Sequence, residues 1–216
     1  MSIGMILLIV IALLIVFGVL ERTLDRMALT DRQALLLVAL IFIGGWLPDI
    51  TVGMVTFNIG GALIPLGVCI YLFFHAGTGK ERGRCLFAAV LSAAAITAIN
   101  WVFPADPTAM PFDPLLLYGA CGGVIAWLLG RSRRSAFIAG VLGVILADVV
   151  GGLSVLLRGV NQPISLGGAG AVDAIVISGV TAVMLFELVG EFMESMKTVK
   201  SNATHDDGAI EGGARA

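Results

Sequence analysis

The sequence predicts an all-α, polytopic membrane protein: a bundle of about seven transmembrane helices in a single domain. Hydrophobic residues make up 58% of the 216 residues and charged residues only 13%, whereas a soluble domain has roughly 25% charged residues. The mean hydropathy is +1.02. Apolar stretches of about 17 to 25 residues, the length that crosses a bilayer, recur along the chain. We therefore expect a multi-pass protein of the cell membrane.

The apolar stretches give the predicted spans in chain order. They lie at about residues 3–20, 34–48, 51–74, 86–103, 115–130, 136–157 and 169–190, and together they form one transmembrane domain over residues 1–190. The second stretch is short and the third is interrupted, so segment 34–74 forms either two full spans or a pair of broken helices. The first stretch has no basic residue before it and no small-residue cleavage site after it, so we expect a span rather than a signal peptide.

The polar end of the chain, residues 191–216, is predicted to be a cytoplasmic tail. From about Lys197 onward it is polar and poor in large apolar residues, ending in SNATHDDGAIEGGARA. Such a composition cannot bury enough apolar surface to fold. We expect this tail to be disordered from about residue 197.

Basic residues fall in alternate loops, and this pattern gives the predicted orientation. Loops 21–32, 75–85 and 131–135 each contain three Lys or Arg residues. Segments 48–51 and 104–114 contain none, and segment 158–168 contains only Arg158. Because cytoplasmic loops carry the excess of Lys and Arg, the N-terminus is expected outside and the C-terminus in the cytoplasm.

Residue types that many enzymes and metal sites need are scarce in this chain. It has two histidines, His75 and His205, and three cysteines without a CxxC pair. Neither a Ser–His triad nor a metal site is expected, and no cofactor is implied. The net charge is −2, and the membrane topology accounts for the basic residues, so no nucleic-acid partner is expected. The expected partner is the lipid bilayer.

Two aspartates interrupt the last two apolar stretches. Asp148 lies in GVILADVVGG and Asp173 lies in GGAGAVDAIVISG, and neither stretch contains a Lys, Arg or His. An ionisable residue in hydrocarbon is costly and by default indicates function. If the two carboxylates meet, burial and repulsion outweigh the stabilisation from a helix N-terminus, and we expect them to share one proton. The sequence thus predicts an intramembrane two-aspartate site.

The third apolar stretch contains the polar segment TFNIGGALIPL. Pro65 removes a helix hydrogen bond, and Gly60 and Gly61 weaken the helix, so we expect this span to be kinked or broken. Irregular backbone at membrane depth is tolerated only against protein or a water-filled cavity. Asn58 is therefore a candidate partner of the two acids. The alternative is a helix-packing motif in which Asn58 makes one interhelical hydrogen bond.

A glycine pair directly follows the first acid. Gly151 and Gly152 either end or kink the helix near Asp148, or the helix continues to about Leu157. In the second case Asp148 lies roughly 13 Å from the outer end, at 1.5 Å per residue. The depth of the carboxylate thus depends on whether these glycines break the helix.

Glycines also precede the second acid. Gly167, Gly168 and Gly170 allow the backbone to approach a neighbour or a ligand closely, and they place Asp173 near the start of its helix. The connecting segment begins with Arg158, which is a possible charge partner of either acid. An Asp–Arg pair would clamp two helices together without any chemistry.

Three segments of the chain carry a family resemblance. FNIGGALIPL, LADVVGG and GGAGAVDAIVISGV resemble the signature segments of an uncharacterised prokaryotic family of multi-pass membrane proteins, known only as a domain of unknown function. The resemblance covers nearly the whole chain up to about residue 190. It implies that Asn58, Asp148 and Asp173 belong to one family-defining site, and it supplies no activity.

A weaker resemblance is to GxGD-type intramembrane aspartyl proteases, the presenilin, signal peptide peptidase and prepilin peptidase kind. Presenilin-like members have one catalytic Asp on the sixth span and another after a Gly-x-Gly on the seventh, which implies catalytic roles for Asp148 and Asp173. The sequence departs from this pattern. Two residues separate the Gly-Ala-Gly at 168–170 from Asp173, an alanine replaces the tyrosine before Asp148, and no Pro-Ala-Leu motif follows.

Three functions fit these residues. In an aspartyl protease-like hydrolase, Asp148 and Asp173 would act as a dyad on a membrane peptide. In a proton- or cation-coupled transporter or channel, the same acids would bind a small cation or relay protons, with Asn58 as an oxygen ligand. In a structural or assembly protein, Arg158 would clamp the acids. The sequence leaves open whether the protein is an enzyme.

Overall fold

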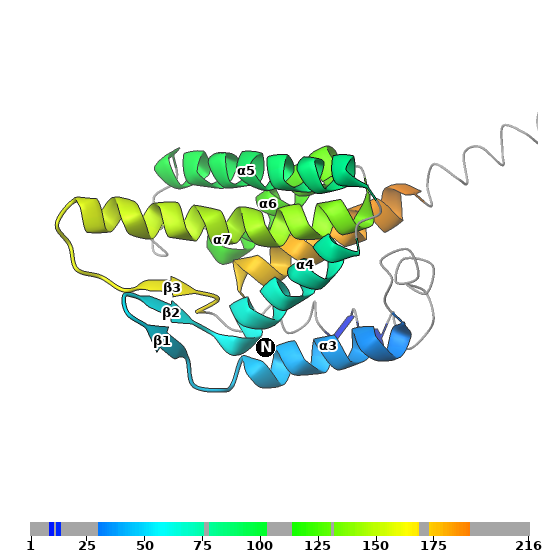
Figure 1. The fold of residues 1–216 in the computed structure, drawn as a ribbon, viewed down its shortest axis with the longest axis horizontal. Coiled ribbons are helices and arrows are strands. Elements are labelled where there is room, and N and C mark those ends of the chain that lie inside the picture. Colours follow the sequence, from blue (N-terminus) through cyan, green and yellow to red (C-terminus); the bar gives the residue numbers. More distant parts are fainter. Residues whose placement is uncertain are drawn as a thin grey trace, which may run out of the picture.

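The computed structural model describes residues 9, 10, 12, 13, 30–75, 78–102, 114–130, 132–168 and 173–190, and these are mostly helical, as predicted (Figure 1). The predicted tail, Gly170 and most of the predicted first span lie outside the described residues. The helices are α3 (Asp31–Gly44), α4 (Ile64–Phe74), α5 (Gly79–Val102), α6 (Pro114–Gly130), α7 (Arg133–Leu157) and the helix Ala174–Gly190. The other elements are β1 (Ile50–Val52), β2 (Val55–Phe57), β3 (Ile164–Leu166) and the π-helix η1 (Ile59–Leu63).

Two of the described helices are long and apolar enough to cross a membrane, judged by length and composition. They are α5, with 24 residues, and α7, with 25 residues. The remaining apolar helices are shorter, at Arg32–Gly44, Ile59–Phe74, Leu116–Gly130 and Ala174–Gly190. The described part of the chain thus supports a helical fold with two membrane-capable helices, and the predicted count of seven goes beyond it.

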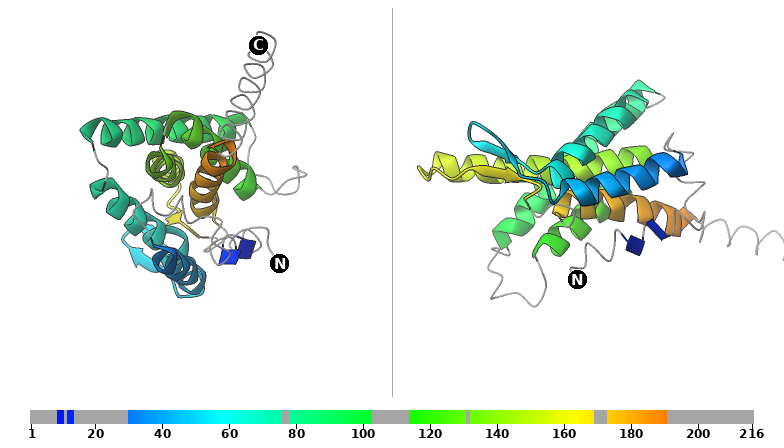
Figure 2. Two further views of the ribbon diagram at one scale, coloured as in Figure 1. Left: turned by 90° about the vertical axis from the view of Figure 1, so that its right-hand side faces the viewer. Right: turned by 90° about the horizontal axis from the view of Figure 1, so that it is seen from below.

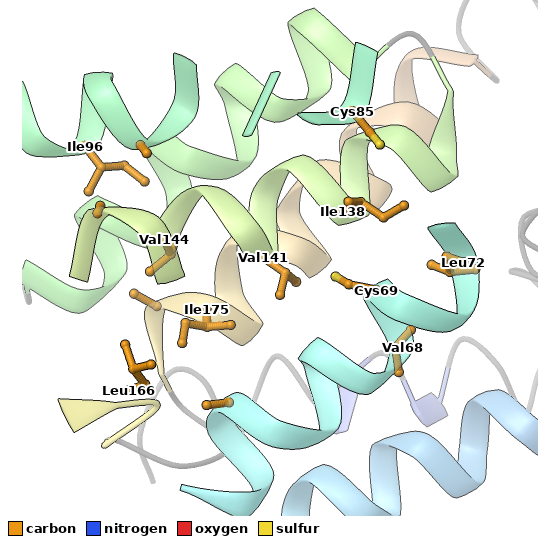
Figure 3. Packing of buried hydrophobic residues seen from close by; sticks show 14 of the residues in the cluster. Val68, Cys69, Leu72, Cys85, Ile96, Ile138, Val141, Val144, Leu166 and Ile175 are labelled. Atoms are coloured by element: carbon orange, nitrogen blue, oxygen red, sulfur yellow. The ribbon is translucent and has the colours of Figure 1, made fainter. Parts of the chain in front are cut away.

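Helix α7 lies at the centre of the fold, against α5, α6 and α4 (Figures 1 and 2). The helix Ala174–Gly190 packs on it through small residues: the Ser178 hydroxyl donates to the Gly140 carbonyl at 3.0 Å. A Cβ added at Gly143 would lie 2.6 Å from the Ser92 Cβ of α5. Small residues therefore let these helices approach closely. Figure 3 shows the apolar core that they enclose.

A three-stranded sheet stands at one end of the bundle, and it corrects the predicted span 51–74. Strands β1 and β2 form an antiparallel hairpin that turns at Gly53, where φ is +63°, and β3 pairs with β2 in parallel. The helical part of this stretch therefore begins only at Ile59. The prediction was wrong here because hydropathy does not distinguish a β-branched strand from an apolar helix.

Segment 34–74 thus forms a helix, a hairpin and a second helix. Helix α3 ends at Gly44, where it crosses the start of η1: a Cβ added at Gly44 would lie 2.9 Å from the Gly60 amide nitrogen. A Cβ at Gly60 would run into the Ile41 carbonyl. The two glycines therefore allow two backbones to touch. Of the two alternatives for this segment, the structure has an interrupted pair rather than two continuous spans.

Helix α7 is not broken by its glycines. It runs through Gly151 and Gly152 to Leu157. A Cβ added at Gly152 would collide with the side chain of Ile164 in β3. The sheet therefore packs against α7 where this helix lacks a side chain.

Candidate functional site

The segments that carry the predicted site residues meet at the sheet end of α7. The backbone amide of Asn58 donates to the Leu166 carbonyl at 3.0 Å, which joins the start of η1 to the end of β3. Gly167 follows with φ of +72°, and a Cβ there would lie 2.5 Å from the Ala62 nitrogen. Only glycine combines that backbone conformation with this close approach. The structure thus brings the Asn58 segment and the segment before Asp173 together.

Asp148 lines a pocket at this end of α7. The pocket has a volume of about 250 Å³ and lies between α7, the end of α5 and segment 162–165. Its polar side chains, besides Asp148, are Asn100, Gln162 and Ser165. We call it the Asp148 pocket. Gly151, on the same helix, opens it further because no atom lies within 4 Å of the position of its missing Cβ.

The Asp148 carboxylate has no protein partner within the described ranges. It forms neither a hydrogen bond nor an ion pair there, although the residue is partly buried. The charged group that acts on it is Asp173, which has the same sign. A partly buried charge without a partner is costly. Such a site favours an occupant that neutralises the carboxylate.

Asp173 is held in a different way. The residue is 6% exposed, and its carboxylate accepts a hydrogen bond from the Ile175 amide at 2.9 Å. Its carbonyl accepts from the Ile177 amide at 3.0 Å, so Asp173 caps the N-terminus of the helix Ala174–Gly190. A helix N-terminus stabilises a carboxylate by about 0.3–1 kcal/mol, or up to about 2 kcal/mol when partly buried. Asp173 therefore has a structural role, and it does not line the Asp148 pocket.

The side chain of Asn58 is also held by hydrogen bonds to nearby residues. The residue is 4% exposed. Its side-chain nitrogen Nδ2 donates to the Asp49 carboxylate at 2.8 Å, and its side-chain oxygen Oδ1 accepts from the Gly61 backbone amide at 2.8 Å. It caps η1 and does not line the Asp148 pocket. Gly60 and Gly61 are buried within η1, and Pro65 lies in the first turn of α4, where proline is tolerated. These residues shape the backbone next to the acids.

Arg158 is exposed at the C-terminal end of α7. Among the residues that the structure describes, it forms no ion pair with Asp148 or Asp173. Gly168 is also exposed. In the same part of the chain, no group of three or more His, Cys, Asp or Glu residues could hold a metal ion. The geometry thus gives no support to a clamp at Arg158.

Three polar residues of the pocket, Asn100, Gln162 and Ser165, were not predicted as site residues. Asn100 lies near the end of α5, and an amide at the end of an apolar stretch was the available signal. Ser165 lies in β3, and nothing in the sequence distinguishes it from a solvated loop serine. Its position next to Asp148 depends on the parallel pairing of β3 with β2.

The comparison with known protein families gives a match. Residues 32–185 match the family model described as "Protein of unknown function (DUF1614)". No curated protein matches the chain, and no solved structure matches it. The match confirms the resemblance to a family of unknown function. The weaker resemblance to GxGD-type proteases has no support from these comparisons.

Proposed function

Because the chain belongs to this family of unknown function, we propose a function from its geometry: a proton- or cation-coupled membrane transporter or channel whose ion site is Asp148. The observation that carries the proposal is the Asp148 carboxylate. This carboxylate has no hydrogen bond or ion pair to a described residue. Asp148 lines a pocket of about 250 Å³. A proton or a small cation would neutralise the carboxylate.

The lining of the pocket favours a small, hard ion. Asn100, Gln162 and Ser165 offer neutral amide and hydroxyl oxygens, which are the ligand types that hard cations take. The pocket is smaller than the roughly 300–1,000 Å³ typical of organic ligand sites. The Asp148 carboxylate supplies a single negative charge. Repulsion from Asp173 raises the free energy of this charge when no cation or proton is bound to it. A proton or a monovalent cation matches this charge.

The apolar surface of the helices supports a membrane setting. In the most apolar 18-residue windows of α5 and α7, only 33% and 28% of the residues are buried. Large side chains point outward from them, with Phe87 64%, Val90 58% and Leu153 51% exposed. The core helix of a soluble protein would bury such residues, because each Å² of apolar surface left in water costs about 25 cal/mol. These faces fit contact with lipid.

We extend the proposal to the predicted topology: seven spans in the cell membrane, with the N-terminus outside and the C-terminus inside. The gathering of basic residues at one end of the bundle supports it. Arg134 donates to the His75 carbonyl at 2.8 Å, and Arg82 donates to the Phe74 carbonyl at 3.2 Å. The sheet lies at the opposite end (Figure 1). In this topology the Asp148 pocket lies in the outer half of the bilayer.

An aspartyl hydrolase acting on membrane peptides is the second candidate. The electrostatic interaction between Asp148 and Asp173 favours it, since a dyad needs two neighbouring acids. Two observations favour the ion site instead. One carboxylate oxygen of Asp173 accepts a hydrogen bond from the Ile175 amide. Asp173 also does not line the pocket that Asp148 lines.

The test uses the full-length protein reconstituted into liposomes that contain a pH-sensitive dye, with imposed H⁺, Na⁺ or K⁺ gradients. We expect ion-dependent dye signals that Asp148→Asn lowers at least about tenfold, a loss of roughly 1.4 kcal/mol or more in ion binding. Asn100→Ala should lower them less, because it removes a neutral ligand. Asp49→Asn is the matched control, since it changes an exposed acid outside the pocket and should leave transport unchanged.

Two results would decide against the ion site. If Asp148→Asn transports as well as the wild type under every gradient, Asp148 is not the site. If instead the protein cleaves membrane peptides and both Asp148→Asn and Asp173→Asn abolish cleavage, the hydrolase is the better description.

A further inference from the structure

The groove between α3 and α4 is a second feature of the surface. It has a volume of about 440 Å³, and its walls are almost wholly apolar. Leu36 and Leu37 of α3 form one wall, and Ile64, Gly67 and Val68 of α4 form the other. The Asp148 pocket has a separate lining, on α5, α7 and segment 162–165. The groove is therefore distinct from the Asp148 pocket.

The geometry of the two helices keeps this groove open. They touch where Gly44 meets Gly60 and diverge from there toward the start of α3 (Figure 1). No atom lies within 4 Å of the position that a Cβ at Gly67 would take. Ile64 and Tyr71, the first and last lining residues on α4, are seven residues apart, which corresponds to about 10 Å along the helix. The groove can thus hold an extended hydrocarbon segment.

One end of the groove is polar and basic. Arg32 and Gln33 line it there, in the first turn of α3, and Tyr71 lines it from the last turn of α4. Gln33 is engaged in the helix cap, since its side chain accepts from the Thr30 amide at 2.9 Å. The Arg32 guanidinium forms no hydrogen bond or ion pair with a described residue. It is therefore available to bind an anion at the mouth of the groove.

We infer that this groove binds an anionic phospholipid, with the phosphate at Arg32 and an acyl chain between α3 and α4. A guanidinium binds phosphate oxygens with a paired set of hydrogen bonds, and apolar walls exclude water from the chain. The basic end lies on the side predicted to face the cytoplasm, where anionic lipids attract basic residues. The inference rests on the membrane setting proposed above and not on ion binding at Asp148.

The test titrates delipidated, full-length protein in detergent with phosphatidylglycerol or phosphatidylcholine and counts bound lipids by native mass spectrometry. We expect preferential binding of phosphatidylglycerol. Arg32→Gln should weaken that binding about fivefold and remove the preference, as expected for one basic residue at an anionic lipid surface. Gly67→Leu should fill the groove and weaken both lipids. Arg158→Gln, an exposed arginine at the other end of the bundle, is the matched control and should change nothing.

Several outcomes would overturn the inference. Arg32→Gln that binds phosphatidylglycerol like the wild type would exclude the headgroup contact, even if Gly67→Leu fails to fold. Displacement of the lipid by millimolar inorganic phosphate would indicate a free-anion site. A change in oligomeric state without a change in lipid binding would indicate that a second copy of the chain covers the groove.

The failure of this inference can be separated from that of the proposed function. Asp148→Asn should retain wild-type binding of phosphatidylglycerol, because Asp148 lies outside the groove. If the protein floats with liposomes but binds no phosphatidylglycerol, only the lipid site is wrong. If it does not float with liposomes, the membrane setting and the lipid site fail together.

Discussion

Replacing Asn58 by alanine is expected to destabilise the junction between the sheet and η1. The Gly61 amide, which is buried, would lose its acceptor at 2.8 Å, and the Asp49 carboxylate would lose a donor at 2.8 Å. A lost helix cap that leaves a buried N–H unpaired costs about 1–2 kcal/mol. The bond to Asp49 adds no more than about 1 kcal/mol, because Asp49 is exposed. We therefore expect a loss of about 1–3 kcal/mol.

A thiol-reactive dye can measure this loss in detergent during heating. Cys69 and Cys85 are 2% and 1% exposed, so they react only when the protein opens. For a chain of this size, 1 kcal/mol shifts the midpoint by roughly 2–4 °C. Asn58→Ala should therefore lower the midpoint by about 2–12 °C.

Two further variants test the assignment of each bond. Asn58→Ser retains an acceptor for the Gly61 amide and loses only the bond to Asp49, so it should cost about 1 kcal/mol. Adding Asp49→Ala to Asn58→Ala should cost little more than Asn58→Ala alone, since the pair shares one bond. The reasoning is refuted if serine is as destabilising as alanine, or if Asn58→Ala melts like the wild type.

Three more substitutions test the packing at the two ends of the bundle with the same melting assay. Gly152→Val should cost about 1–3 kcal/mol, because its side chain would displace Ile164 of β3, whereas Gly151→Ala, with open space around it, should be neutral or stabilising by up to about 1 kcal/mol. Glu187→Gln should cost about 3 kcal/mol, since it breaks the part-buried ion pair with Arg133 at 2.8 Å. Equal melting of the two glycine variants, or a wild-type midpoint for Glu187→Gln, would contradict these assignments.

The sequence predicted the long helices well and the sheet not at all. The predicted stretches 115–130 and 136–157 end where α6 and α7 end. Stretch 86–103 missed the start of α5 by seven residues, because the helix continues into the charged residues at 80–84, where hydropathy falls. The strands are three residues long, too short for an alternating pattern to be recognised. The pairing of β2 with β3 joins segments far apart in the sequence, such as Val55 with Ile164.

The two acids were predicted as a pair, and the sequence could not distinguish their roles. The charge of Asp173 acts on Asp148, and a proton shared between the two acids stays a prediction. The acid at the start of the last helix is the one that accepts a hydrogen bond from a backbone amide. The glycine-rich sequence before this helix does not define its first residue. The partner of Asn58 was equally hidden, because Asp49 reaches it only after the hairpin folds back across nine residues. Local sequence thus indicated the polar residues, and the fold assigned their partners.

The glycines after Asp148 show why such assignments require the tertiary structure. The pair Gly151 and Gly152 predicts either a break in the helix or a close contact with a neighbouring element. These two alternatives place the Asp148 carboxylate at different distances from the outer end of the helix. Gly152 faces Ile164, so the missing side chain is filled by the sheet and the helix stays intact. Gly151 faces open space beside the carboxylate. One glycine therefore fixes β3 against α7, and its neighbour leaves room for an ion next to Asp148.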